Sequence, residues 1–239
     1  MAQITQKQLQ RRLHAHLTNH YMQLHNTLVS VTLAAGGLAA ASLISSGNAR
    51  EPERWLYWVM WAGVLLAIAV AYVGTATGVF MLPVGVPSAL DLLLPLVIGV
   101  SQFIAFWVLL QKNNPLGSPG PAEVVRAWLF AMTGFGLACI ISILRAKRMV
   151  QENDYEGKLK KVVSFYRSSL GCDALGASFM TVLCAAGGFL FSLDKHVSMP
   201  RTFGIVGFVV LAIVFGLVQH HFTGRGLKIR IADAGALLN

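Results

Sequence analysis

Long, continuously apolar runs separated by short polar segments dominate this chain. A transmembrane helix needs about 20 consecutive, largely apolar residues. Six runs approach that length, and their continuous apolar character favours helices over the alternating strands of a membrane barrel. We therefore predict an all-α polytopic membrane protein with six transmembrane helices, at residues 28–45, 55–80, 89–110, 124–144, 175–193 and 203–220.

Two more polar stretches have apolar residues at every third or fourth position, which is typical of amphipathic helices. One stripe leads into the first apolar run and the other, surrounded by lysines, leads into the fifth. We expect two amphipathic cytoplasmic helices, lying at anionic lipid headgroups, against each other or on a neighbouring subunit. The stripes are Leu13, Leu17, Tyr21, Leu24 and Leu28 in the first, and Leu159, Val162, Val163, Tyr166 and Leu170 in the second.

These elements make one membrane domain that occupies the whole chain. Its predicted parts are an amphipathic N-terminal helix, four spans, a basic cytoplasmic helix and loop, two further spans and a C-terminal tail. In residue numbers they are 1–27, 28–144, 145–174, 175–222 and 223–239.

Composition and charge agree with a membrane location. Only 12% of the 239 residues are charged, against roughly a quarter in soluble domains. The net charge of +9 comes from basic residues that flank the apolar runs, so it indicates orientation rather than nucleic-acid binding. With six spans, thirteen of the 19 lysines and arginines fall on the side of both termini. The positive-inside rule then places both termini in the cytoplasm, at a plasma membrane or a bacterial inner membrane.

A short internal repeat is visible as VTLAAGGL at residues 31–38 and VLCAAGGF at residues 182–189. A shift of 151 residues superimposes both AAGG motifs and also Arg50 on Arg201. Each copy follows a basic amphipathic stretch and precedes another span, which indicates a parallel duplication. The two AAGG helices should then cross the membrane in the same direction.

Small residues allow close approach between membrane helices. The AAGG glycines Gly36, Gly37, Gly187 and Gly188, and the GxxxG pair Gly74 and Gly78, are therefore candidates for helix packing or for a pore lining.

Three polar residues in apolar surroundings are candidates for transport or gating, because polar groups in a membrane are costly. Asp91 lies in the irregular stretch MLPVGVPSALDLLLP, whose prolines favour a broken helix. The alternative role of Asp91 is structural, in a capping box that begins at Ser88. Asp173 is the second candidate, with an interfacial ion pair to nearby basic residues as its alternative. Gln102 is the third, and its amide is suited to a hydrogen bond between helices.

Enzyme chemistry has little support, so we predict a non-enzyme. GxSxG, HExxH, Walker-type and GxGxxG motifs are absent from the sequence. His16 and His20 have a spacing that can share a metal, but no nearby cysteine or carboxylate completes a ligand set. We expect neither a metal nor a cofactor.

Two functions remain open from the sequence. The first is a small oligomeric channel or transporter subunit that moves ions or small solutes. The alternative is a non-catalytic scaffold subunit of a larger envelope assembly, such as a secretion system. Expected partners are a lipid bilayer with anionic headgroups and either further copies of the chain or partner membrane subunits.

Overall fold

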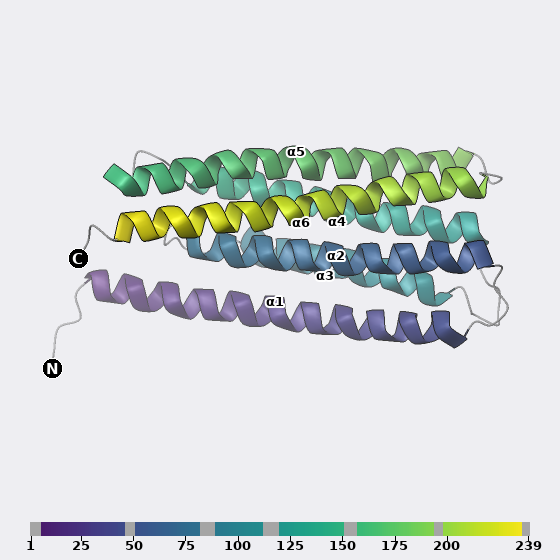
Figure 1. Ribbon diagram of the computed structural model, residues 1–239. Coiled ribbons are helices and arrows are strands. Elements are labelled where there is room, and N and C mark those ends of the chain that lie inside the picture. Colours follow the sequence, from purple (N-terminus) through teal and green to yellow (C-terminus); the bar gives the residue numbers. More distant parts are fainter. Residues whose placement is uncertain are drawn as a thin grey trace.

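The computed structural model describes the backbone of residues 6–45, 51–81, 89–111, 120–150, 157–193 and 198–235 (Figure 1). Side chains are described for residues 19, 22–45, 52–75, 93–111, 120–150, 160–193 and 198–231. The described part forms six helices and no strand. They are α1 (Gln6–Ser45), α2 (Glu51–Met81), α3 (Ala89–Gln111), α4 (Pro121–Met149), α5 (Gly157–Leu193) and α6 (Met199–Gly235).

All six helices are long and apolar enough to cross a membrane. This confirms the predicted all-α fold and indicates an integral membrane protein. Continuous hydrogen bonding within each helix satisfies the backbone, which lipid cannot do. The start of α1 and the end of α6 lie at the same end of the bundle, as Figure 1 shows. We call this the terminal end, and the end that holds the α1–α2 and α5–α6 connections the distal end.

The helices form two packed layers of three. Helix α2 lies between α1 and α6 in one layer, and α4 lies between α3 and α5 in the other. Contacts of α1 with α3, of α2 with α3 and α4, and of α5 with α6 join the layers. Helix α2 therefore touches four neighbours and occupies the middle of the bundle.

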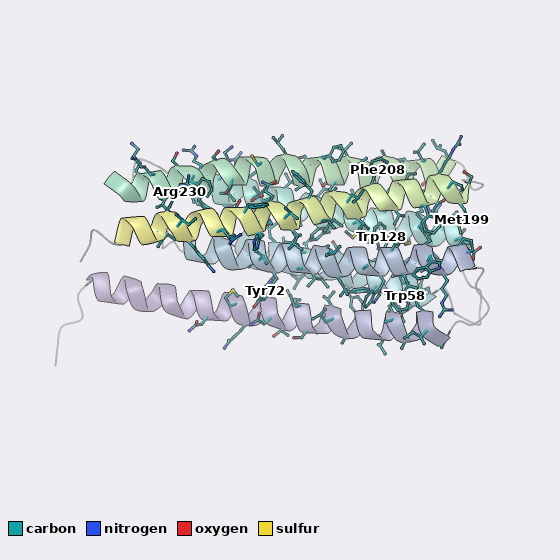
Figure 2. All side chains as sticks on the ribbon, viewed as in Figure 1. Trp58, Tyr72, Trp128, Met199, Phe208 and Arg230 are labelled. Carbon is teal, nitrogen blue, oxygen red and sulfur yellow. The ribbon has the colours of Figure 1, made fainter. Side chains whose placement is uncertain are left out.

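A large apolar core joins all six helices in the distal half of the bundle. Its largest fully buried side chains include Trp128 on α4, Phe106 on α3 and Met60 on α2. Trp128 lies inside the bundle in Figure 2. Close packing drives helix association in lipid, so this core is the main determinant of the fold.

The expected amphipathic helices do not form separate elements. The basic stretches are the N-terminal parts of α1 and α5, which continue without interruption into the spans. The described stripe on α5 is buried within the chain, where Val162, Tyr166 and their neighbours pack against Val150 and against Leu227 of α6. This contact with the end of α4 and with α6 differs from the expected placements at lipid headgroups, against the other amphipathic stretch or on a neighbouring subunit.

The prolines of the irregular stretch break α3 less than expected. Helix α3 begins at Ala89 and continues through Pro95 to Gln111, so Pro95 lies inside it. Pro95 is the seventh residue of the helix, and one lost hydrogen bond there has not ended it. Residues 82–88, with Ser88, lie outside the described part.

The two AAGG helices, α1 and α5, run in the same direction through the bundle (Figure 1). Each is followed by an antiparallel partner, α2 or α6, and those two partners contact each other. The common direction agrees with a parallel duplication, which itself stays a prediction.

Candidate functional site

Asp173 on α5 is a carboxylate with only 6% of its side chain exposed. Its Oδ1 atom accepts a hydrogen bond of 2.7 Å from Nε2 of Gln219. Its Oδ2 atom lies 3.7 Å from Nδ1 of His220, whose side chain is 15% exposed. Two adjacent residues of α6 thus contact the two oxygens of one carboxylate.

The pair lies within the candidate membrane spans of α5 and α6. Asp173 is about 30 Å along α5 from Leu193 at the distal end, and about 9 Å from Arg167 toward the terminal end. His220 is about 8 Å along α6 from Arg225. A closer basic group is Lys147 of α4, whose Nζ lies 3.4 Å from a Cβ built on Gly171, two residues before Asp173.

Helix α2 contacts the imidazole of His220 at Gly74. A Cβ atom built on Gly74 would lie 3.5 Å from Nε2 of His220 and 3.6 Å from its Cε1. A larger side chain at this position would occupy the space next to the ring. Gly74 is thus a contact of the candidate site, which gives the GxxxG glycine a specific neighbour.

A second polar contact joins α1 and α2 at a similar height. His25 on α1 stacks on Tyr72 of α2 with ring centroids 5.6 Å apart and an interplanar angle of 25°. Tyr72 points from α2 toward α1 in Figure 2. The buried Nε2 atom of His25 has no hydrogen-bond partner within the described part of the chain, and unsatisfied polar atoms of this kind are rare in native proteins.

Together these groups form what we call the polar layer: His25, Tyr72, Gly74, Asp173, Gln219 and His220. Its members come from α1, α2, α6 and α5, which are neighbours in that order. These residues lie at a similar height along the bundle axis, as residue counting along each hairpin shows. His25 and Tyr72 are nearly equally far from the α1–α2 connection, and Asp173 and His220 are nearly equally far from the α5–α6 connection.

Gln102, the candidate on α3, is buried and lies apart from the polar layer among the residues of the apolar core. Its Nε2 atom has no partner among the described groups, so the expected hydrogen bond between helices is not made by this atom. The neighbouring Ser101 lies against α4, with its Oγ 3.1 Å from a Cβ built on Gly134.

Four candidate residues fall wholly or partly outside the description. Asp91 is in the first turn of α3, but its side chain is not described, and the same holds for Gly78 on α2 and for His16 and His20 on α1. Among the side chains that are described, no three His, Cys, Asp or Glu residues gather as metal ligands would.

Three of the four AAGG glycines pack inside the chain. A Cβ on Gly36 would meet Phe106 of α3 at 2.9 Å. The backbone carbonyl oxygen of Gly36 accepts a 2.8 Å hydrogen bond from Nε1 of Trp61. A Cβ on Gly187 would meet Ile205 at 2.9 Å, and one on Gly188 would meet Phe130 at 3.0 Å. Gly37 has open space beside it. The two copies use their first glycine alike, since each admits a side chain from the layer opposite its own helix, Phe106 of α3 at Gly36 and Ile205 of α6 at Gly187.

Sequence reasoning identified Asp173 but missed Gln219, His220, His25 and Tyr72. A usable signal was present, because residues equally far from the turn of an antiparallel helical hairpin lie at the same height. Counting outward from residue 196 places Asp173 opposite Gln219. Comparison with known proteins adds no further assignment: no protein-family model, no curated protein and no solved structure matches the chain.

Proposed function

We propose that the chain is a small membrane channel or transporter that moves protons past the Asp173–His220 pair. The observation that carries this proposal is a carboxylate 6% exposed inside a membrane bundle, 3.7 Å from an imidazole. Ionisable residues within membrane segments are rare and typically mark ion pathways or proton relays. This carboxylate lies at the interface between two helices, and ionisable residues within membrane segments usually face the interior of a helix bundle.

The groups present favour a proton over a metal cation. Carboxylate and imidazole are the side chains most often used to take up and release protons. Hard metal cations instead need about six oxygen ligands, whereas Asp173 contacts the amide nitrogen of Gln219 and an imidazole nitrogen of His220. Proton exchange between Oδ2 of Asp173 and Nδ1 of His220 needs the two atoms to close from 3.7 Å to hydrogen-bonding distance, and it needs no wider ligand shell.

The path has two unequal halves. On the terminal side, one to two helical turns separate the pair from Arg167 and Arg225. On the distal side, the fully buried Trp128, Phe106 and Met60 fill the space between the layers. We assign this arrangement as open to protons from the terminal side and closed on the distal side, so that transport needs a rearrangement of the distal core.

The remaining expectations become part of the same proposal. The chain lies in a plasma membrane or a bacterial inner membrane, with both termini on the cytoplasmic side. It works as a homo-oligomer or with partner membrane subunits. The apolar faces of α5 and α6, including Phe179, Phe208 and Phe215, then contact lipid or a neighbouring subunit.

The second candidate function is a non-catalytic scaffold subunit, and the filled distal core favours it. A scaffold needs packing surfaces and no path, and the fully buried aromatic residues of the core suit that role. In this reading the Asp173–His220 pair only fixes α5 against α6.

Proton flux in proteoliposomes separates the two functions. The purified protein is reconstituted with an entrapped pH-sensitive dye, and a potassium gradient with valinomycin drives proton entry. The proposal predicts a flux well above that of protein-free liposomes, unchanged when sodium replaces the external choline. Flux equal to that of empty liposomes, from protein shown to be folded and inserted, would favour the scaffold.

A further inference from the structure

An open groove lies between α5 and α6 near the terminal end of the bundle. Lys160, Lys161, Ser164, Phe165 and Ser168 of α5 line it together with Arg230 of α6. Its volume is about 600 Å³, within the range of roughly 300–1,000 Å³ that is usual for ligand pockets. The charged side chains that line it, among the described residues, are all basic.

Arg230 is held in the groove by two contacts. Its guanidinium carbon lies 3.9 Å from the centroid of the Phe165 ring, a cation–π geometry. Its Nη1 also donates a 3.4 Å hydrogen bond to the backbone oxygen of Gly226. A Cβ on Gly226 would lie 2.8 Å from Cζ of Phe165, so glycine is what lets the ring reach this position. The arginine is thus oriented by the protein before any ligand arrives.

Helix α5 supplies donors along one face. Lys160, Ser164 and Ser168 are four residues apart in succession, so they lie one above another on the helix. Two lysine ammonium groups, two hydroxyls and a guanidinium make a donor set that suits a phosphate, because arginine and lysine bind phosphate oxygens with charge-assisted hydrogen bonds.

The same face of α5 becomes apolar toward the membrane interior. After Ser168 and Cys172 it continues with Leu175, Phe179 and Val182, whose exposed fractions are 74%, 59% and 65%. The change occurs near Arg167 and Arg225, where the polar edge of the bundle begins. Along α5, the phosphate donors are thus followed by an exposed apolar stripe. This order matches a phospholipid, whose headgroup would meet the donors and whose acyl chain would lie along the stripe.

We propose that this groove is a binding site for an anionic phospholipid, with its phosphate between Arg230 and the lysines and its acyl chain along α5. The site is independent of proton transport, since it lies beyond the polar layer toward the terminal end. Lipid bound there joins the ends of α5 and α6, the two helices that carry Asp173 and His220.

Native mass spectrometry of the detergent-purified protein, titrated with phosphatidylglycerol or phosphatidylcholine, tests the site. The groove variant combines Lys160→Gln, Lys161→Gln and Arg230→Gln. The matched control combines Arg148→Gln, Arg225→Gln and Lys228→Gln, which removes three exposed basic residues at the same end but outside the groove. The groove variant loses the three cations that would contact the lipid phosphate, so it should bind phosphatidylglycerol at least about tenfold more weakly. The control should change less than about threefold.

Phe165→Leu separates a built site from general surface charge, because it removes the cation–π contact and leaves every charge in place. Weaker binding of phosphatidylglycerol by this variant, with wild-type preference over phosphatidylcholine lost, supports the proposal. Equal losses in the groove and control variants would overturn it. Displacement of the lipid by an equal concentration of soluble glycerol phosphate would also overturn it, since the groove would then take a free phosphate compound. Size-exclusion profiles and helical circular dichroism confirm that each variant is folded.

Discussion

Nδ1 of His220 on α6 lies 3.7 Å from Oδ2 of Asp173 on α5, within the candidate membrane spans of both helices. The other carboxylate oxygen accepts a hydrogen bond from Gln219. Burying a charge without a partner is costly. The surrounding helices must therefore hold Asp173 and His220 in contact. The predictions below follow from that arrangement and from the packing that supports it.

Gln219→Leu should destabilise the protein by about 1–3 kcal/mol, because the buried Oδ1 atom of Asp173 loses its hydrogen-bond donor. The measurement is reversible unfolding in mixed micelles, followed by circular dichroism. Gln23→Leu is the matched control, since Gln23 is exposed on α1 and its change should stay within about 0.5 kcal/mol. Equal stability of the two variants would mean that the 2.7 Å hydrogen bond contributes nothing.

Gly74 tests the contact between α2 and His220. Gly74→Ala should be tolerated, because its Cβ would meet Nε2 of His220 at 3.5 Å, an ordinary contact distance. Gly74→Leu should push the imidazole aside and reduce proton flux in proteoliposomes at least about tenfold, the size of effect expected when a proton-transfer group is misplaced. Gly207→Leu on α6, where a Cβ meets nothing within 4 Å, should keep the wild-type flux. If Gly74→Leu transports normally, His220 does not need this position.

The first AAGG motif contains its own control. Gly36→Ala should cost about 1–3 kcal/mol, because its Cβ would come within 2.9 Å of the fully buried Phe106 ring. Gly37→Ala meets nothing and should be neutral or slightly stabilising, since alanine favours helix more than glycine does. Unfolding in mixed micelles compares the two. A pair of equal effects would contradict the packing role assigned to Gly36.

Orientation in the membrane can be measured by cysteine labelling. In a variant whose three cysteines are replaced by alanine, Ser198→Cys at the distal end should react with an impermeant thiol reagent added to intact cells. Lys228→Cys at the terminal end should react only after permeabilisation. Both positions are exposed, so access depends on the side of the membrane alone. The reverse pattern would place the termini outside and contradict the positive-inside assignment.

The six helices could be predicted because each apolar run alone satisfies the length that a bilayer requires. The close approach at Gly36 and Gly187 was also foreseeable, because small residues in lipid indicate helix contacts. The partners of Asp173 were harder to predict. How far along the hairpin a residue lies follows from counting residues. Which residues of α6 face Asp173 also depends on the rotation of α6 about its axis. An apolar helix with polar residues at only one end leaves that rotation undetermined.

The structure also changed the reading of the polar stretches. The stripe of Val162, Val163, Tyr166 and Leu170 has the same spacing whether it faces lipid headgroups or protein. Only the presence of Val150 and Leu227 beside it decides for protein. Likewise, Pro95 signals a possible break, yet the helix continues through it. Patterns within one segment do not reveal which segment packs against it.

The central claim is that Asp173 carries the transported proton, and proton flux of Asp173→Asn in proteoliposomes tests it most directly. The asparagine keeps the size and shape of the side chain but has no carboxylate to protonate. His221→Gln, at an exposed position next to the pair, is the control and should transport as the wild type does. We predict that Asp173→Asn reduces the flux at least about hundredfold, at the lower end of the range for losing a general acid or base, while its size-exclusion profile stays normal. A folded Asp173→Asn protein with wild-type proton flux would contradict the account.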